Sequence, residues 1–385
     1  MFRSCSKSNK NGKGKIVPLL ILTTLLVSVV FITSPKPIIR TALAKSGNSS
    51  YIVIEQSSNR ILKADNENMQ LPMASTTKAM TAIIVIENAK LNDIVTIPNE
   101  AVGVEGSSIY LKAGEKWSVK DLLYGLMLRS GNDSAVALAF HTAGSIDNFV
   151  SLMNKKVDEL GLKNTKFKNP HGLSEKGHYT SAYDLAIISS YAMNNPIFKE
   201  IVSTKMHVAK ANNDTENHYF ANKNRILYNY SGANGIKTGY TIEAGRCLIA
   251  SSERNGMQVI AVAINHYNYF DLCADLMDYA YENYEMKKLL DKNKIYATIP
   301  VKKGGKIKNA DLYSNHDLYF PIKKDGSEEI RLEISTIDKI TAPHNLETSC
   351  GSIKIYVGNC LKFDEKLYTI YNIEKKFSIV DIWSN

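Results

Sequence analysis

Short segments that alternate or run apolar occur near residue 50 and again after residue 245. The stretch 51–66 predicts two short strands around a Ser-Ser-Asn turn. Residues 246–252 and 257–264 predict a second hairpin, closed by Arg254-Asn255-Gly256. Helical patterns fill the region between the two hairpins. This arrangement predicts one α/β (α+β) domain in which strands from both ends share a sheet.

The helical stretches differ in how their apolar residues are distributed. Residues 76–89 are apolar on most faces, which predicts a buried helix. Residues 146–160 and 181–194 predict amphipathic helices, and a long helix is expected over 270–290. The stretch 118–142 is helical by periodicity but is interrupted at Ser130-Gly131-Asn132.

A different pattern begins after residue 294. Short strand-like runs, separated by Gly, Asp-Gly or Asn, continue to the end of the sequence. They predict a separate small all-β domain at 294–385, after an α/β domain at 45–293 and an N-terminal segment at 1–44.

The net charge of the chain is concentrated in that N-terminal segment. The sequence has 47 Lys+Arg against 38 Asp+Glu, a net charge of +9 over 385 residues. Residues 1–44 hold seven basic and no acidic residues, which leaves 40 basic against 38 acidic residues in 45–385. We therefore expect no nucleic-acid partner. The basic residues at 302–308 are interpreted as a solvated turn.

The N-terminal segment has the features of an export signal. Basic residues precede an apolar run at 16–33, and Ala42-Leu43-Ala44 follows with small residues at signal-peptidase spacing. The run is near the roughly 18 residues that span a membrane, so an uncleaved membrane anchor is the alternative. Both interpretations place the remainder of the chain outside the cytoplasm.

Cysteine usage predicts no required disulfide. Four cysteines (Cys247, Cys273, Cys350 and Cys360) follow the N-terminal segment, far fewer than a disulfide scaffold needs. Cys350 and Cys360 flank a predicted two-residue turn at Gly358-Asn359, which places them out of register with each other.

Three short motifs carry the candidate chemistry. In Ser75-Thr76-Thr77-Lys78 the spacing of three puts a hydroxyl and an amine on one helical face, where a desolvated lysine can activate a serine. Taken alone, this motif is more often an ordinary helix start.

The second and third motifs are also ambiguous on their own. Ser130-Gly131-Asn132 offers a hydroxyl and an amide on a tight turn, although a plain interhelical turn explains it equally. Lys237-Thr238-Gly239 precedes a strand pattern, where Gly239 lets a ligand approach the backbone closely. On a regular strand Lys237 and Thr238 point to opposite faces.

Together, the order and spacing of these motifs resemble the S-x-x-K, S-x-N and K-T-G set of penicillin-recognising enzymes. The segments LPMASTTKAMTA, LRSGNDSAVALA, NPHGLSEKGHYTSAYDLA and GIKTGYTIEAGRCLIASSERNGMQVIAV extend the likeness. Over about residues 48–370 the chain is similar to the low-molecular-mass serine D-alanyl-D-alanine carboxypeptidases. The resemblance implies a transpeptidase/β-lactamase-like domain followed by a β-rich domain.

The resemblance also implies roles for individual residues. Ser75 would be the acylated nucleophile and Lys78 its base, with Ser130 and Asn132 assisting proton transfer and peptide positioning. The implied partners are a peptidoglycan stem peptide ending in D-Ala-D-Ala and β-lactam antibiotics, with no cofactor.

The third motif would bind the substrate. Lys237 and Thr238 would hold the terminal carboxylate, and the backbone N–H groups of Ser75 and Tyr240 would form the oxyanion hole. We expect Lys237, as a like-charge neighbour, to act together with burial in favouring a neutral amine on Lys78.

Other functions remain open at this stage. A serine β-lactamase would share the acylation step, but the E-x-x-L-N segment of such enzymes is missing between the second and third motifs. A non-catalytic wall-binding protein that keeps the fold is a further alternative. His171, Glu175 and His178 lack a helical metal-binding frame, so no metal is expected.

Overall fold

The computed structural model describes residues 47–211 and 216–376. Its central element is a five-stranded antiparallel sheet in the order β2-β1-β9-β8-β7. The strands are β1 (Ser50–Glu55), β2 (Ile61–Asp65), β7 (Ala233–Thr241), β8 (Gly245–Arg254) and β9 (Met257–Ile264). Because β1 pairs with β9, the N-terminal hairpin joins the hairpin predicted around Asn255. The predicted closure of the domain by its two ends is confirmed.

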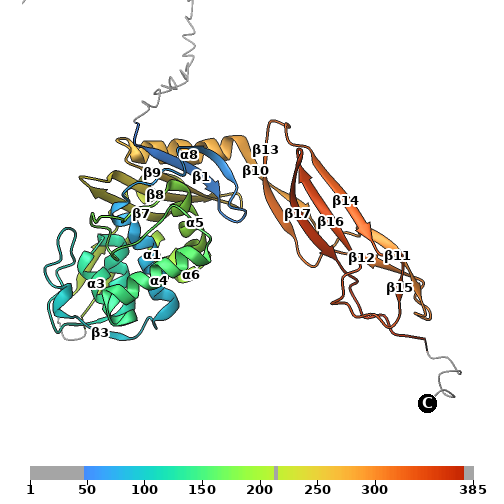
Figure 1. Ribbon diagram of the computed structural model, residues 1–385, viewed down its shortest axis with the longest axis horizontal. Helices are drawn as coiled ribbons and strands as arrows, with labels where there is room; N and C mark the ends of the chain where they lie inside the picture. Colours follow the sequence, from blue (N-terminus) through green and yellow to red (C-terminus); the bar gives the residue numbers. More distant parts are fainter. Residues whose placement is uncertain (1–46, 212–215, 377–385) are drawn as a thin grey trace, which may run out of the picture. The chain divides into compact units, whose positions relative to one another are not determined.

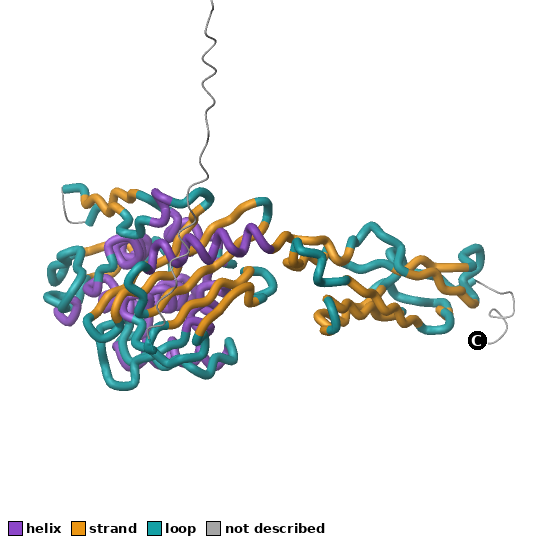
Figure 2. Tube along the Cα trace, turned by 90° about the horizontal axis from the view of Figure 1, so that it is seen from above, coloured by secondary structure: helices purple, strands orange, loops and turns teal. Residues whose placement is uncertain are grey.

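Side-chain alternation along these strands separates two apolar layers. Ile52 and Ile260 belong to the larger core cluster, together with the helices α1 (Lys78–Asn88), α5 (Ala182–Met193) and α6 (Pro196–Ser203). Val53 and Ala261 belong to a second cluster with α8 (Tyr269–Asn283). The sheet therefore lies between α8 on one face and α1, α5 and α6 on the other (Figures 1 and 2). Burial on both faces explains why β9 reads as a continuous apolar run.

The other elements of this domain are short. The helical elements are η1 (Ala74–Thr77), α1 (Lys78–Asn88), η2 (Asn99–Ala101), α2 (Val119–Tyr124), the π-helical turn η3 (Gly125–Arg129), α3 (Asn132–Ala143), α4 (Ile146–Glu159), α5 (Ala182–Met193), α6 (Pro196–Ser203) and α7 (Ile226–Asn229). The remaining strands form two hairpins, β3 (Ile94–Thr96) with β4 (Lys116–Ser118), and β5 (Met206–Ala209) with β6 (His218–Ala221).

Several helix boundaries follow from local capping. Ser145 and Ser181 accept hydrogen bonds from the third residue after them, as N-cap serines do. These caps fix the starts of α4 and α5, the two amphipathic helices predicted from periodicity.

Two helix predictions were wrong in part. The helix expected over 270–290 ends at Asn283, and Tyr284–Leu290 is strand β10, paired with β13 (Leu318–Lys323). Strand pairing outweighs the helical propensity of these residues. The helix expected over 76–89 begins as the 3₁₀ turn η1, in which Ala74 has a positive φ of 47°.

The C-terminal part consists of strands, as predicted. Besides β10 and β13 it contains β11 (Ala297–Lys302), β12 (Asn309–Leu312), β14 (Ile330–Thr336), β15 (Ile340–Thr341), β16 (Gly351–Val357) and β17 (Cys360–Leu367). Strands β14, β16 and β17 form one antiparallel sheet (Figure 1). The C-terminal part has an apolar core separate from those of the first domain, and this core includes Leu290, Ile353 and Leu367.

The described cysteines are all free. Cys360 is exposed and lies opposite Val357, whereas Cys350 is buried and precedes β16. The predicted mismatch in register is therefore confirmed.

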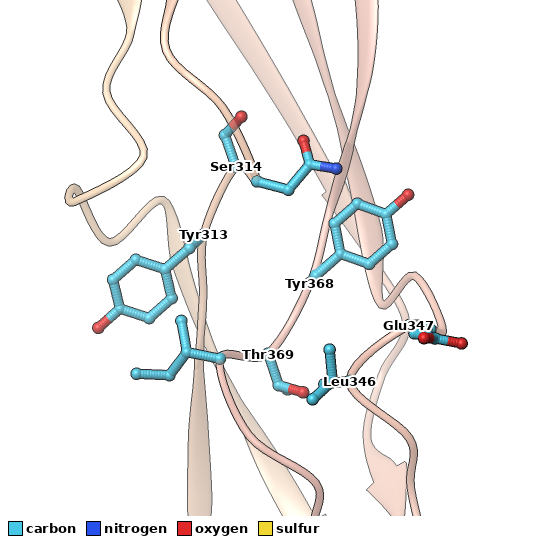
Figure 3. Close-up of a pocket in the computed structure, with 8 residues that line it drawn as sticks. Tyr313, Ser314, Leu346, Glu347, Tyr368 and Thr369 are labelled. Atoms are coloured by element: carbon cyan, nitrogen blue, oxygen red, sulfur yellow. The ribbon is translucent and has the colours of Figure 1, made fainter.

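A cavity of about 420 Å³ lies in the same β-rich part, ringed by side chains that include Tyr313, Tyr368 and Leu346 (Figure 3). None of the three sequence motifs contributes to its lining.

Within the described ranges, no helix is long and apolar enough to cross a membrane. The apolar run predicted to act as an export signal or anchor lies in residues 1–46, outside the described part of the chain.

Candidate active site

The first motif lies where η1 passes into α1. Ser75 is half-buried, whereas Thr76, Thr77 and Lys78 are buried. The left-handed conformation of Ala74 precedes the serine directly and costs about 1–2 kcal/mol. The serine therefore sits on a strained turn at the start of a buried helix.

Lys78 is the centre of the site. Its Nζ lies 3.0 Å from Ser75 Oγ, 2.6 Å from Asn132 Oδ1 and 2.6 Å from the backbone oxygen of His171. The amide and peptide oxygens can only accept hydrogen bonds, so a neutral amine spends both of its N–H groups on them. Its lone pair is then left for the hydroxyl proton of Ser75. This geometry is that of a base beside a nucleophile.

The electrostatic surroundings of Lys78 favour the neutral amine. Complete burial lowers its pKa well below the usual value, and the positive charges of Lys237 and Lys223 lower it further. The carboxylate of Asp133 acts in the opposite direction and raises this pKa. The net direction is the one that a general base requires.

The second motif is a sharp break between two helices. Ser130 ends the π-helical turn in a left-handed conformation with φ of 65°, and α3 starts at Asn132. Both residues are buried. Asn132 donates from Nδ2 to the backbone oxygen of Glu105 at 2.5 Å, which leaves its Oδ1 for Lys78. The contact between Asn132 and Lys78 joins the first two motifs.

The third motif lies on β7, the outer strand of the sheet. A Cβ added to Gly239 would lie 3.0 Å from the backbone nitrogen of Ser75, so this strand passes directly beside the serine. Lys237, on the same face as Gly239, is buried and donates to the backbone oxygen of Thr238 at 2.9 Å. Burial, with Lys223 nearby, lowers the pKa of Lys237 to about 7.

Thr238 and Tyr240 alternate with these residues along β7. Pairing with β8 is regular from Gly235 to Thr241, so Thr238 leaves the strand on the face opposite to Lys237. Tyr240, two residues further along β7, lies on the same face as Thr238 and is exposed. The structure thus brings Ser75, Lys78 and Asn132 into direct contact, with the third motif alongside.

Three contributors to the site were missed by sequence reasoning. The first is the backbone oxygen of His171, in a loop held by a hydrogen bond from Thr81 Oγ1 to Pro170 O. The second is Asp133, which anchors the neighbouring chain segment. The third is Lys223, whose charge acts on both buried lysines.

His171, in the Asn-Pro-His-Gly segment, and His178, further along the same loop, are neutral supports. Burial is the main reason that the pKa of His171 is lowered to about 3 and that of His178 to about 4. His178 lies 2.9 Å from Thr77 Oγ1, which donates to Ala74 O beside the serine. In the described ranges, no group of three or more His, Cys, Asp and Glu is placed to hold a metal ion.

Comparisons with known proteins agree with this geometry. A family profile described as D-alanyl-D-alanine carboxypeptidase matches residues 39–268, and another, described as penicillin-binding protein 5, C-terminal domain, matches residues 284–375. The D-alanyl-D-alanine carboxypeptidase DacF of Bacillus subtilis is 36% identical over 348 residues, covering 86% of this chain and 89% of the relative. DacA of Escherichia coli is 33% identical over 325 residues, covering 79% and 78%.

The fold is also similar to that of solved structures in this family. The crystal structure of penicillin binding protein 5 from Haemophilus influenzae matches with a TM-score of 0.71 at 29% identity, covering 85% of this chain and 97% of that one. The architecture is thus that of a penicillin-binding protein, with a mixed helix and sheet domain followed by an all-β domain. The chain belongs to the D-alanyl-D-alanine carboxypeptidase family, a family of serine hydrolases. The fold class and family predicted from the sequence are confirmed.

Proposed function

We propose that this enzyme removes the terminal D-Ala from peptidoglycan stem peptides ending in D-Ala-D-Ala, through an acyl-enzyme on Ser75. The observation that carries the proposal is the placement of the Lys78 amine. It contacts Ser75 Oγ while two carbonyl oxygens occupy its remaining hydrogen-bonding positions. A hydroxyl next to a buried, unprotonated amine is an activated nucleophile.

Acylation follows from the positions of the groups. The terminal carboxylate of the peptide binds the ammonium of Lys237. Thr238 leaves β7 on the opposite face, so we assign its hydroxyl a hydrogen bond to the same carboxylate around the free edge of this strand. Ser75 Oγ attacks the carbonyl carbon of the penultimate D-Ala as its proton moves to Lys78 Nζ. The backbone N–H groups of Ser75 and Tyr240 stabilise the resulting oxyanion.

Breakdown of the tetrahedral intermediate needs a proton on the leaving nitrogen. The ammonium of Lys78 supplies it, with the hydroxyl of Ser130 as relay, and the C–N bond breaks to release D-Ala. A water molecule then attacks the ester carbonyl and gives its proton to Lys78. The shortened peptide leaves and Ser75 recovers its hydroxyl.

β-Lactams are expected to acylate the same serine, since they present a carbonyl and a carboxylate at comparable positions. The β-lactamase alternative needs a carboxylate that activates water for rapid deacylation. In the described part of the chain, Lys78 hydrogen-bonds to Ser75, Asn132 and His171 rather than to any carboxylate. This arrangement favours the carboxypeptidase.

The proposed place of action is outside the cytoplasm, where peptidoglycan is assembled. The basic and apolar composition of residues 1–44 supports export or membrane anchoring.

The function is tested with the wild-type protein and two reagents. Incubation with a pentapeptide ending in D-Ala-D-Ala should release free D-Ala, measured by mass spectrometry. Incubation with benzylpenicillin should add one drug mass to the protein, and peptide mapping should locate it in the peptide that contains Ser75. A label without D-Ala release would favour a non-catalytic binding protein, and rapid hydrolysis of the drug would favour a β-lactamase.

Substrate binding should weaken as the pH rises through about 7. Lys237 holds the carboxylate only while protonated, and its pKa is about 7 in the free enzyme. Half of Lys237 is protonated at pH 7 and only about 3% at pH 8.5, so we expect KM for the pentapeptide to rise about fifteenfold between these two pH values. Steady-state kinetics across this range measure the effect.

Lys223 provides the control for this prediction. Its positive charge lowers the pKa of Lys237, so the substitution Lys223→Gln should raise that pKa and move the rise in KM to higher pH. A KM profile that is flat in the wild type, or identical in the variant, would contradict the assignment of the carboxylate to Lys237.

A further inference from the structure

Tyr110 is presented to solvent in a way that folding does not explain. Its side chain is 83% exposed, and its backbone has φ of +64°, a left-handed conformation that glycine adopts freely and a bulky residue adopts rarely. A large aromatic side chain at such a position gains little from burial and keeps its strain. Strained backbone conformations of this kind cluster at active sites and ligand-binding sites.

The backbone around Tyr110 is firmly anchored. The carboxylate of Asp133, only 1% exposed, accepts hydrogen bonds from Ser108 Oγ at 2.6 Å, Ile109 N at 3.0 Å and Leu111 N at 3.2 Å. The N–H of Tyr110 itself donates to Ser108 Oγ at 2.8 Å. These bonds hold the tyrosine from both sides, so its ring projects from a rigid support.

The same chain segment forms a wall of the candidate active site. Asn132 donates from its backbone N–H to Ser107 O at 2.7 Å and from Nδ2 to Glu105 O at 2.5 Å. Asn132 in turn contacts the Lys78 amine. A Cβ on Gly106 would lie 2.9 Å from Asn132 Nδ2, which shows how closely this wall is packed. The segment that carries Tyr110 is therefore held directly by Asn132 and Asp133.

We propose that Tyr110 is a substrate-contact residue that stacks against a sugar ring of the glycan carrying the stem peptide. This inference rests on the proposed function. The C–H groups on one face of a pyranose ring meet the electron-rich face of an aromatic ring favourably, while the sugar hydroxyls stay in water. An exposed, rigid tyrosine provides such a face.

The contact requires a stem peptide that reaches from Ser75 to Tyr110. In a pentapeptide attached to a sugar, four residues separate the sugar from the scissile bond. An extended chain covers about 3.3–3.6 Å per residue, so the sugar lies up to about 14 Å from Ser75. The segment that contains Tyr110 is connected to Ser75 through Lys78, Asn132 and Asp133.

The test compares two substrates that differ only in the sugar. Release of D-Ala is measured for a free pentapeptide and for the same pentapeptide on a disaccharide of N-acetylglucosamine and N-acetylmuramic acid. Tyr110→Ala should lower kcat/KM for the disaccharide substrate about three- to tenfold, through KM, and leave the free pentapeptide unchanged. Tyr110→Phe should keep most of the activity on both substrates.

Two further variants separate substrate contact from folding. Tyr110→Gly relieves the left-handed backbone, so its Tm should rise while its kcat/KM for the disaccharide substrate falls; a folding defect would lower both. Tyr319→Ala removes an exposed tyrosine on β13 and should leave kcat/KM unchanged for both substrates.

The outcomes are distinct. Equal losses on the two substrates, or no loss on the disaccharide substrate, would overturn the sugar contact while leaving the carboxypeptidase intact. If the wild type released D-Ala from neither substrate, the proposed function itself would fail.

Discussion

Replacing Lys78 with methionine should lower the rate of Ser75 acylation by about 10³–10⁴-fold. Methionine fills the buried volume but cannot accept the serine proton, so Ser75 remains a poorly nucleophilic hydroxyl. The measurement is the second-order rate of labelling by a fluorescent penicillin. We expect only a modest fall in Tm, because two effects oppose each other. Asn132 Oδ1 and His171 O lose their donor, which destabilises the protein. Removal of the buried amine, however, also removes the cost of its desolvation.

Two control variants isolate the role of the base. Ser75→Ala sets the zero of the labelling assay, since it removes the nucleophile. Lys78→Arg keeps a positive charge but stays protonated at any working pH, so it should be as slow as the methionine variant. An arginine variant that keeps a tenth or more of the wild-type rate would mean that Lys78 acts through its charge.

The pH dependence of the wild type gives an independent check. Acylation needs the unprotonated amine, so its rate should rise with pH until Lys78 has lost its proton. Burial and the charge of Lys237 lower the pKa of Lys78 well below that of a free lysine, so the plateau should begin well below the pH at which free lysines titrate. A rate still rising at the pH where ordinary lysines titrate would contradict a depressed pKa.

The features that the sequence predicted correctly are those recorded in local patterns. The hairpin at Asn255 and the strands around it follow from two short apolar runs that flank a two-residue turn, a pattern that depends on adjacent residues only. The relation between Ser75 and Lys78 follows from helical spacing. The motif order then identified the family, because three short motifs in a fixed order are far more specific than any one of them.

The features that were missed depend on long-range contacts. His171 contributes its backbone oxygen, an atom that every residue carries. No side-chain pattern can therefore indicate it. Lys223 acts through charge at a distance, and its role emerges only when the fold brings it near Lys78 and Lys237. The wrong helix end at Asn283 has the same origin, because β10 exists only through its pairing with β13.

The loop that supplies His171 O leads to the second prediction. Gly172→Ala should cost at least about 3–4 kcal/mol of stability and lower acylation of Ser75 by about 100-fold or more. A Cβ at this position would lie 1.9 Å from Ala74 O and 2.5 Å from its carbonyl carbon, a collision with backbone that no rotamer change can relieve. Either the loop moves away and takes His171 O from Lys78, or the turn before Ser75 shifts.

Gly144→Ala is the matched control for this substitution. Gly144 has φ of +77° and Gly172 has φ of +91°, so both substitutions carry the left-handed penalty of about 1–2 kcal/mol. A Cβ on Gly144, however, meets nothing within 4 Å. The difference between the two variants therefore isolates the collision with Ala74. Thermal unfolding and penicillin labelling measure it: if the two variants lose equal stability and keep equal labelling rates, the close packing of this loop against the serine turn is not what holds the site together.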